Sequence, residues 1–320
     1  MKWGQKPCPL SLKTTSFLGQ EKTKKTYKQT FSKKVNLFPD KTMTTQVIKT
    51  IKGTIEYSLA GTGIPILFVH GGHSSCNETL FHKGFDTKRF CLITPSRPGY
   101  GKTPLSNIFS PKDTAELFIT LLDELKLKTV IVVGISAGGL TAIELTSNFP
   151  DRVKKLILIS AVTKRWMTEK DNTYQKAKKL FSPTFEKYSW GLFRLFYSLF
   201  PRLMANTMFK ELSSIQPTNI TNDEVAELHT MIKLQRSKKG FVNDLDQDIE
   251  QNIIREIICP TIILHSLNDN SVNIEQANYA HTQIKKSILK VYNNKWGHLL
   301  WLGQESSIPI KDTLNFIDNE

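Results

Sequence analysis

The chain has 320 residues, of which 39% are hydrophobic and 22% charged. This balance is typical of a globular protein that buries a sizeable core, and it excludes a fibrous or wholly disordered chain. No stretch reaches the ~18 apolar residues that a membrane-spanning helix needs. Residues 1–30 also lack the continuous apolar core of a secretory signal. We therefore expect a globular, cytoplasmic protein without stable membrane insertion.

The net charge of +14 is concentrated at the start of the chain. Residues 1–42 hold ten lysines against two acidic residues, so they contribute +8, and the other 278 residues contribute +6. This lysine-rich stretch has no apolar periodicity, which predicts a basic, disordered tail. A basic arm for nucleic acid or an anionic membrane is the minor alternative, and translation could instead start at Met43. We expect no nucleic-acid partner.

The cysteines have neither metal-ligand nor disulfide-framework spacing, since they are scattered at Cys8, Cys76, Cys91 and Cys259. We expect reduced thiols, and no metal site.

From about residue 46 the sequence alternates short β-rich runs with helical patterns, which is typical of a mostly parallel sheet covered by helices on both faces. The first two runs, 46–51 and 54–59, predict an antiparallel hairpin around Gly53. Continuous apolar runs, typical of strands buried on both faces, follow at 65–70, 90–94, 129–133, 155–159, 261–265 and 288–292. A helix is predicted over 111–125, with Ser110 as its N-cap and Pro111 in the first turn.

One connection is far longer than a simple crossover. About 100 residues separate the run that ends at residue 159 from the run that begins at residue 261, whereas a crossover needs roughly a dozen. We therefore predict a core formed by residues 43–163 and 246–320, with a helical cap of residues 164–245 inserted into it.

The sharpest motif is Gly-Ile-Ser-Ala-Gly-Gly at 134–139, which directly follows the run 129–133 and opens into a helical pattern over 140–148. A nucleophile at a sharp strand-to-helix turn needs small residues two positions before and after it, because the turn brings backbones together. The helix N-terminus behind it favours developing negative charge. These features predict Ser136 as a nucleophile. A glycine-rich turn with an incidental serine is the alternative.

A second motif, His-Gly-Gly-His at 70–73, also ends an apolar run. Acyl transfer needs two backbone N–H donors for the tetrahedral oxyanion, one from the residue after the nucleophile and one from a loop of this kind. We predict Ala137 as the first donor and Gly72 as the second, with His73 as its alternative. Taken alone, the loop could be an ordinary glycine turn.

The predicted base is His298, which follows Gly297 just after the last apolar run and so shares the sheet edge of Ser136. The predicted acid is Asp269, four residues past His265, where a carboxylate could fix the tautomer of the imidazole. A turn aspartate is the alternative for Asp269. The other histidines have plainer interpretations: His70 is structural, His265 ends a strand, and polar contexts predict exposure for His82, His229 and His281.

From about residue 46 to its end, the chain resembles the α/β-hydrolase-fold superfamily. The resemblance rests on His-Gly-Gly, on Ser-Arg-Pro-Gly-Tyr-Gly at 96–101, on the serine turn, and on the order Ser136, Asp269, His298. It implies an α/β fold with an eight-stranded, mostly parallel sheet and a cap after the sixth strand. The Arg-Pro-Gly-Tyr-Gly loop is assigned a structural role.

Within this superfamily, a serine nucleophile argues against epoxide hydrolases and haloalkane dehalogenases, which use an aspartate. We expect a serine hydrolase that cleaves a carboxylic ester, or a related acyl bond, of a small to medium apolar substrate without a cofactor. Carbon–carbon bond hydrolysis, thioester cleavage and aminopeptidase activity remain alternatives, as does a catalytically silent ligand-binding protein. Phe193, Phe196 and Tyr197 are predicted to contact the substrate, although packing of the cap on the core explains their spacing equally well.

Overall fold

The computed structural model describes residues 43–216 and 219–319. The tail predicted for residues 1–42, its alternative as a binding arm, and Cys8 lie outside the described residues.

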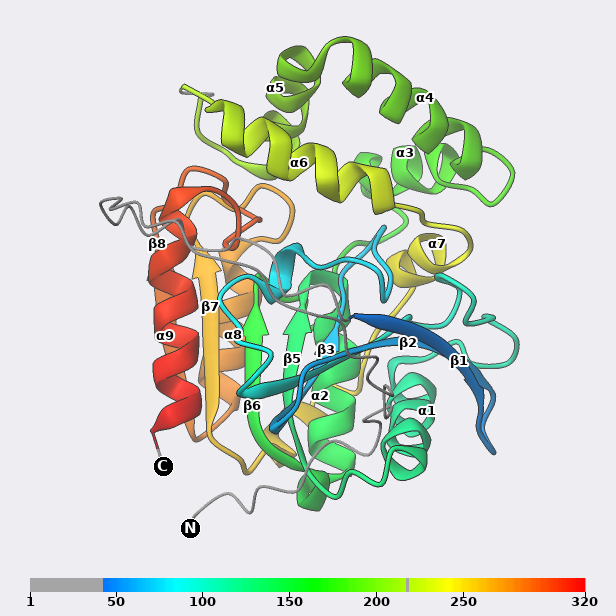
Figure 1. Cartoon of the computed structure of the whole chain (residues 1–320), viewed down its shortest axis with the longest axis vertical. Coiled ribbons are helices and arrows are strands. Elements are labelled where there is room, and N and C mark those ends of the chain that lie inside the picture. The colour runs from blue at the N-terminus through cyan, green and yellow to red at the C-terminus, as the bar shows by residue number, and fades with distance from the viewer. Residues whose placement is uncertain (1–42, 217–218, 320) are drawn as a thin grey trace, which may run out of the picture.

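One eight-stranded sheet organises the chain, in the order β1-β2-β4-β3-β5-β6-β7-β8 (Figure 1). β1 pairs antiparallel with β2, β2 pairs antiparallel with β4, and the other neighbours are parallel. The predicted mostly parallel sheet and its opening hairpin are therefore confirmed. The strands are β1 (Thr44–Lys49), β2 (Thr54–Ala60), β3 (Ile64–Val69), β4 (Phe90–Pro95), β5 (Val130–Ile135), β6 (Val153–Ile159), β7 (Thr261–Ser266) and β8 (Ser287–Tyr292).

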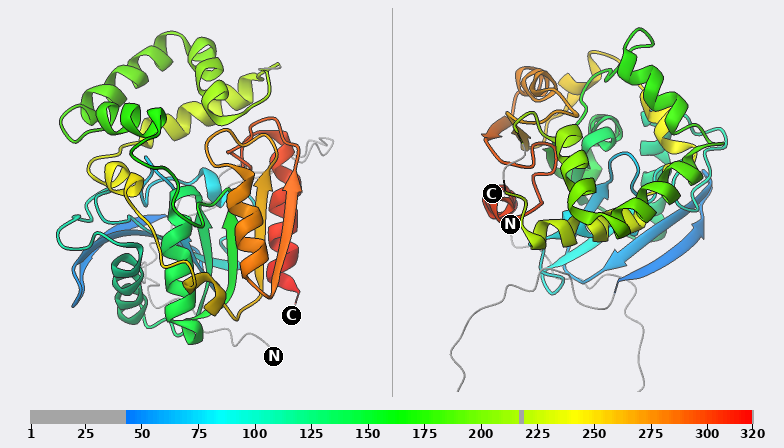
Figure 2. Two further views of the ribbon diagram at one scale, coloured as in Figure 1. Left: turned by 180° about the vertical axis from the view of Figure 1, so that it is seen from behind. Right: turned by 90° about the horizontal axis from the view of Figure 1, so that it is seen from above.

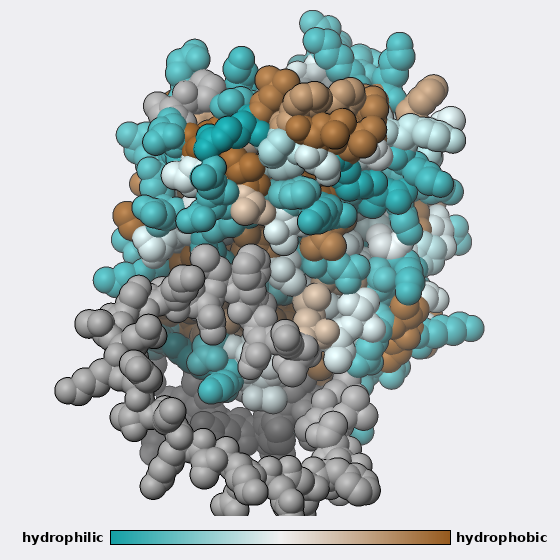
Figure 3. All heavy atoms as spheres, turned by 45° about the horizontal axis from the view of Figure 1, so that its top comes forward, coloured by the Kyte–Doolittle hydropathy of each residue, from teal (hydrophilic) through white to brown (hydrophobic). Residues whose placement is uncertain are grey.

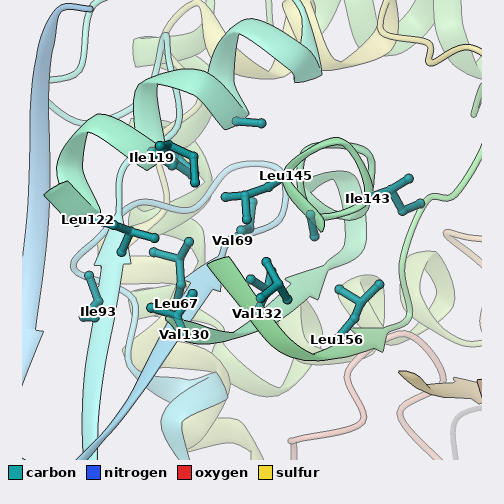
Figure 4. Packing of buried hydrophobic residues seen from close by; sticks show 14 of the residues in the cluster. Leu67, Val69, Ile93, Ile119, Leu122, Val130, Val132, Ile143, Leu145 and Leu156 are labelled. Carbon is teal, nitrogen blue, oxygen red and sulfur yellow. The ribbon is translucent and has the colours of Figure 1, made fainter. Parts of the chain in front are cut away.

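Helices cover both faces of the sheet, because alternate residues of each central strand point to opposite sides. Leu67 of β3 and Val132 of β5 face the helices α1 (Pro111–Glu124) and α2 (Gly139–Asn148) (Figure 4). Helix α8 (Ile274–Gln283) packs in the same cluster. Phe68 and Val133, the next residues along, face the other side, where α9 (Ser307–Asp318) packs. Both faces of the central strands are thus buried, as their continuous apolar sequences predict.

The start of α1 follows its sequence signal closely. The Ser110 hydroxyl accepts a hydrogen bond from the backbone N–H of Asp113, and the Asp113 carboxylate accepts one from the backbone N–H of Ser110. Pro111 occupies the first helical position, where its missing N–H costs nothing. This capping box satisfies two backbone donors, and the N-cap predicted at Ser110 is confirmed.

A group of helices between β6 and β7 forms the cap, which the fold places beyond the carboxyl ends of the parallel strands (Figures 1 and 2). The helical insertion after the sixth strand is confirmed, while the exact domain bounds at residues 164 and 245 stay a prediction. The helices of this segment are α3 (Asn172–Leu180), α4 (Glu186–Leu199), α5 (Pro201–Leu212), α6 (Asn222–Leu234) and α7 (Gly240–Leu245). Across the described ranges, no helix is both long and apolar enough to cross a membrane.

The expected exposure of His82 is wrong. His82 is 1% exposed, and its ring packs against Phe68 and Phe81 with centroid distances of 4.6 and 4.8 Å. A short 3-10 turn, Leu80–His82, directs the ring inward, where its Nε2 lies 2.9 Å from the Thr94 hydroxyl. Burial lowers the pKa of His82 to about 3, so the ring is neutral.

Candidate active site

Ser136 lies at the sharp turn between β5 and α2, with a positive φ of 50°. The flanking glycines have no room for a side chain. A Cβ on Gly134 would lie 2.6 Å from the Cβ of Ala142, and one on Gly138 would lie 2.2 Å from the carbonyl oxygen of Val69. The backbone crowding that the motif predicts is therefore present at both positions. Ser136 itself is partly exposed between buried neighbours.

Three predicted residues from different loops form one chain of hydrogen-bonding distances. The Nε2 atom of His298 lies 3.0 Å from the Oγ of Ser136. The Nδ1 atom of His298 lies 2.9 Å from Oδ2 and 3.1 Å from Oδ1 of Asp269. This order, hydroxyl to imidazole to carboxylate, is the arrangement in which an imidazole can accept the hydroxyl proton while a carboxylate orients it.

The carboxylate of Asp269 is fully buried, and it is tied to its own loop. Its Oδ1 accepts hydrogen bonds from the backbone N–H groups of Ser271 and Val272, at 2.9 and 2.8 Å. His265, at the end of β7, approaches its Oδ2 to 3.4 Å while donating from Nε2 to the Val272 carbonyl. These contacts compensate for the cost of burying the charge and fix the direction of the carboxylate.

One backbone carbonyl group of the cap contacts both the loop that carries His298 and the loop that carries Asp269. The carbonyl oxygen of Leu212, the last residue of α5, accepts a hydrogen bond from the backbone N–H of His298 at 3.0 Å. It also accepts one from Asn270, beside the acid, at 3.3 Å. Gly297 has a φ of 51°, and a Cβ there would lie 2.5 Å from the same carbonyl oxygen. The end of α5 therefore helps to hold the loop of His298 against the loop of Asp269.

Arg97, which is 2% exposed, holds the glycine loop after β3 through hydrogen bonds to its backbone. Its guanidinium donates to the carbonyl oxygens of His70 and Gly71, at 2.7 and 3.1 Å. It also forms a bidentate ion pair with the carboxylate of Asp244 in α7, at 2.6 and 2.7 Å. The structural role assigned to the loop at 96–101 agrees with these contacts. The imidazole of His70 is neutral, because burial and the charge of Arg97 lower its pKa well below 6.5.

Of the loop glycines, Gly71 adjoins the serine: a Cβ built on it would lie 2.9 Å from the Cβ of Ser136. A Cβ on Gly72 would instead lie 2.9 Å from the ring of Phe241. The next residue, His73, has a positive φ of 60°, and its ring packs against the ring of Phe241 at a tilt of 31°, with a centroid distance of 3.8 Å. The loop thus runs between the serine on one side and an aromatic ring on the other.

Phe241 was missed by the sequence interpretation. It lies in α7 and is 6% exposed, next to Phe181 and Trp166 at centroid distances of 5.3 and 6.3 Å. No local sequence signal marks Phe241, because the crowding of its neighbour Gly240 by the ring of Tyr100 is a contact between distant segments. These aromatic rings form a wall beside the glycine loop.

The aromatic residues predicted to contact the substrate lie on different sides of α4. Tyr197 is fully buried within the cap, where its hydroxyl donates to the carbonyl oxygen of Val225 and its ring stacks on His229. Phe193 is partly buried and packs on Tyr197, with a centroid distance of 6.5 Å. Phe196 is 42% exposed. Their role in substrate binding stays a prediction.

Within residues 43–216 and 219–319, no cluster of three histidine, cysteine or acidic side chains is arranged to bind a metal ion.

Comparison with known proteins assigns the family. A family model described as alpha/beta hydrolase fold matches residues 64–302. The chain is 37% identical to YcgS of Bacillus subtilis, named an uncharacterized hydrolase, over 83% of this chain and 96% of YcgS. It is 25% identical to a 2-hydroxy-6-oxo-2,4-heptadienoate hydrolase of Pseudomonas putida, over 79% of this chain and 90% of that one. The structure of the esterase EaEST from Exiguobacterium antarcticum shares its fold, with a TM-score of 0.66 at 20% identity, over 86% and 99% of the two chains.

The chain therefore belongs to the α/β-hydrolase family, and it is a hydrolase. The fold class and the enzyme class that the sequence predicts are confirmed.

Proposed function

We propose that this hydrolase cleaves a carboxylic ester of a small to medium apolar substrate through an acyl-enzyme intermediate. The observation that carries the proposal is the 3.0 Å distance between Ser136 Oγ and His298 Nε2, with Asp269 on the far side of the imidazole. This is the arrangement that activates a serine hydroxyl at neutral pH.

In the proposed reaction, His298 takes the Ser136 proton as Oγ attacks the ester carbonyl carbon. The tetrahedral intermediate then collapses, and the C–O bond to the alcohol breaks as His298 returns the proton to the leaving oxygen. Water next attacks the acyl-enzyme, again deprotonated by His298, and the proton returns to Ser136 as the acid leaves. Asp269 stabilises the imidazolium and does not itself take up a proton.

The oxyanion is proposed to accept hydrogen bonds from the backbone N–H groups of Ala137 and Gly72. Ala137 is the second residue of the 3-10 turn that follows β5, so its N–H has no partner within the turn. Gly72 is proposed as the second donor, with His73, the next residue of the same loop, as its alternative.

The aromatic wall beside the glycine loop supports an apolar acyl or aryl group, because ligand sites are lined mainly by apolar side chains with few polar groups. Phe241 adjoins Gly72 directly, and Trp166 and Phe181 extend the wall. We propose that the acyl part of the substrate lies against Phe241.

A fluorophosphonate probe and a series of p-nitrophenyl esters, from acetate to decanoate, test the proposal. Wild type should be labelled and should hydrolyse at least part of the series, whereas Ser136→Ala should do neither. Ser147→Ala is the matched control, because Ser147 is buried on the following helix α2 and away from His298. It should keep both properties. Absence of labelling in folded wild-type protein would contradict the nucleophile assignment.

Carbon–carbon bond hydrolysis is the second candidate, favoured by the similarity to the Pseudomonas putida hydrolase over 79% of this chain. The same serine would carry it. If the probe labels Ser136 but no ester is cleaved, a 2-hydroxy-6-oxo dienoate should be the next substrate assayed, followed by thioesters and aminoacyl amides.

A further inference from the structure

The outer face of the cap carries a continuous group of exposed apolar side chains, which we call the outer stripe. Its members are between 42% and 72% exposed and recur along α4 and into α5. They are Phe185, Tyr188, Leu192, Leu195, Phe196, Leu199, Phe200 and Leu203. Figure 3 shows hydrophobic residues gathered on the cap at the top of the molecule.

Packing within the cap does not explain the outer stripe, because a different face of α4, the inner one, makes the contacts with the other cap helices. Trp190 and Tyr197 are buried on that inner face, and Phe193 packs between them, at centroid distances of 5.8 and 6.5 Å. The helix is therefore apolar on both faces. A large exposed apolar patch on a globular protein marks a surface that binds another protein, a membrane or a ligand.

The charge of the chain segment around the stripe indicates which kind of partner this surface binds. Residues 164–212 contain ten lysines and arginines against four acidic residues, a balance of +6. Residues 43–320 also carry a net charge of +6, so the part of that range outside residues 164–212 has a net charge of zero. Lys179, Lys187 and Arg202 are exposed beside the stripe, and the Glu186 carboxylate is buried in an ion pair with Arg236. Part of this positive charge, on Lys187 and Arg202, thus lies on the same two helices as the exposed apolar surface.

We propose that the outer stripe docks the protein on an anionic lipid surface. A helix with a strongly apolar face and basic residues around it lies in the membrane interface, where its apolar side chains enter the headgroup boundary and its cations meet anionic lipids. α4 has 14 residues and is too short to span a bilayer, so the association is peripheral. A second copy of the chain fits less well, because a two-fold interface would place the same basic rim against itself.

This docking is independent of the proposed ester hydrolysis, since none of its residues takes part in the Ser136–His298–Asp269 arrangement. The two ideas can therefore fail separately.

Sedimentation with vesicles tests the docking. Full-length protein should bind vesicles of equimolar phosphatidylcholine and phosphatidylglycerol at physiological ionic strength, and bind pure phosphatidylcholine vesicles far less. Leu195→Gln/Leu199→Gln should lower the partition coefficient about tenfold or more, because two leucine side chains no longer enter the interface. Residues 1–42 contribute the same charge of +8 to every variant, so the difference reports the stripe alone.

Ile51→Gln/Ile258→Gln is the matched control. Ile51 is 93% exposed beside α1, and Ile258 is 63% exposed before β7, so both lie away from the cap. This variant should bind as wild type does. All variants should keep the wild-type melting temperature and the wild-type rate on a short, water-soluble ester. Equal vesicle binding by the stripe variant and wild type would overturn the proposal, as would a wild-type dimer that the stripe substitutions convert to a monomer.

A fluorescent label identifies the docking face directly. In a Cys8→Ser background, an environment-sensitive dye on Leu192→Cys should shift to the blue when anionic vesicles are added. The same dye on Ile51→Cys should not. A shift at both positions, or at neither, contradicts docking through the outer stripe.

Discussion

The carboxyl edge of the sheet and the outer face of the cap contrast in how their side chains are fixed. At the sheet edge, Asp269 accepts two backbone hydrogen bonds and His298 contacts both the carboxylate and Ser136. On the outer face of α4, Leu195 and Leu199 are 55% and 59% exposed. The contrast matches the two tasks proposed for these regions: the core fixes the geometry of the proposed catalytic groups, and the outer face of the cap binds a lipid surface.

The largest expected effect lies at the sheet edge. Asp269→Asn keeps an oxygen for the Ser271 and Val272 N–H groups, but its amide would face Nδ1 of His298 and favour the wrong tautomer. Turnover of the best p-nitrophenyl ester should fall on the order of 10⁴-fold, with the melting temperature little changed. Asp246→Asn, an exposed carboxylate 3.4 Å from Lys178, should remain fully active. If Asp269→Asn keeps wild-type turnover, the orienting role of Asp269 is wrong.

The next largest effect is expected at the buried ion pair between Arg97 of the core and Asp244 of α7. Asp244→Ala leaves the buried guanidinium of Arg97 without its carboxylate, which should cost about 3–5 kcal/mol in the free energy of unfolding. Asp123→Ala removes an exposed partner of Arg152 and should cost under about 1 kcal/mol. Urea unfolding of both variants measures the difference. Similar losses for the two would show that burial of the Arg97 pair contributes little.

The smallest effect concerns which aromatic residue meets the substrate. Phe241→Leu removes three carbon atoms from the proposed pocket and should shift the preferred ester chain length. The ratio of kcat/KM between long and short esters should change by about tenfold or more, because each methylene in an apolar pocket is worth about 1–3 kcal/mol. Phe196→Leu, on the exposed side of α4, should leave that ratio unchanged. The reverse result would favour the substrate contacts predicted from the sequence and would move the binding site from α7 to α4.

Most of the fold could be predicted because strands buried on both faces give continuous apolar runs. The runs that became β3, β5 and β7 stand out for this reason, and their carboxyl ends locate the loops of Gly72, Ser136 and Asp269. The edge strand β8 alternates in burial, yet its position after a helix still placed His298 correctly at the sheet edge.

What could not be predicted depends on contacts between distant segments. Helical spacing suggested that Phe193, Phe196 and Tyr197 act together, but α4 is apolar on both faces, so periodicity alone does not tell inside from outside. Phe241 carries no local motif, because its importance comes from its approach to Gly72. His82 was misjudged for the same reason, since its polar neighbours in sequence do not surround it in space.

The carbonyl of Leu212 has a practical consequence for chimeric enzymes. Exchange of the entire cap with that of a relative would replace the end of α5, and so change the position of the carbonyl oxygen that the backbone N–H groups of His298 and Asn270 share. A graft designed to change substrate range should therefore retain the last turn of α5 and replace only the helices before it. The boundary of such a cap graft is therefore determined by a backbone carbonyl group, which a comparison of side chains would not reveal.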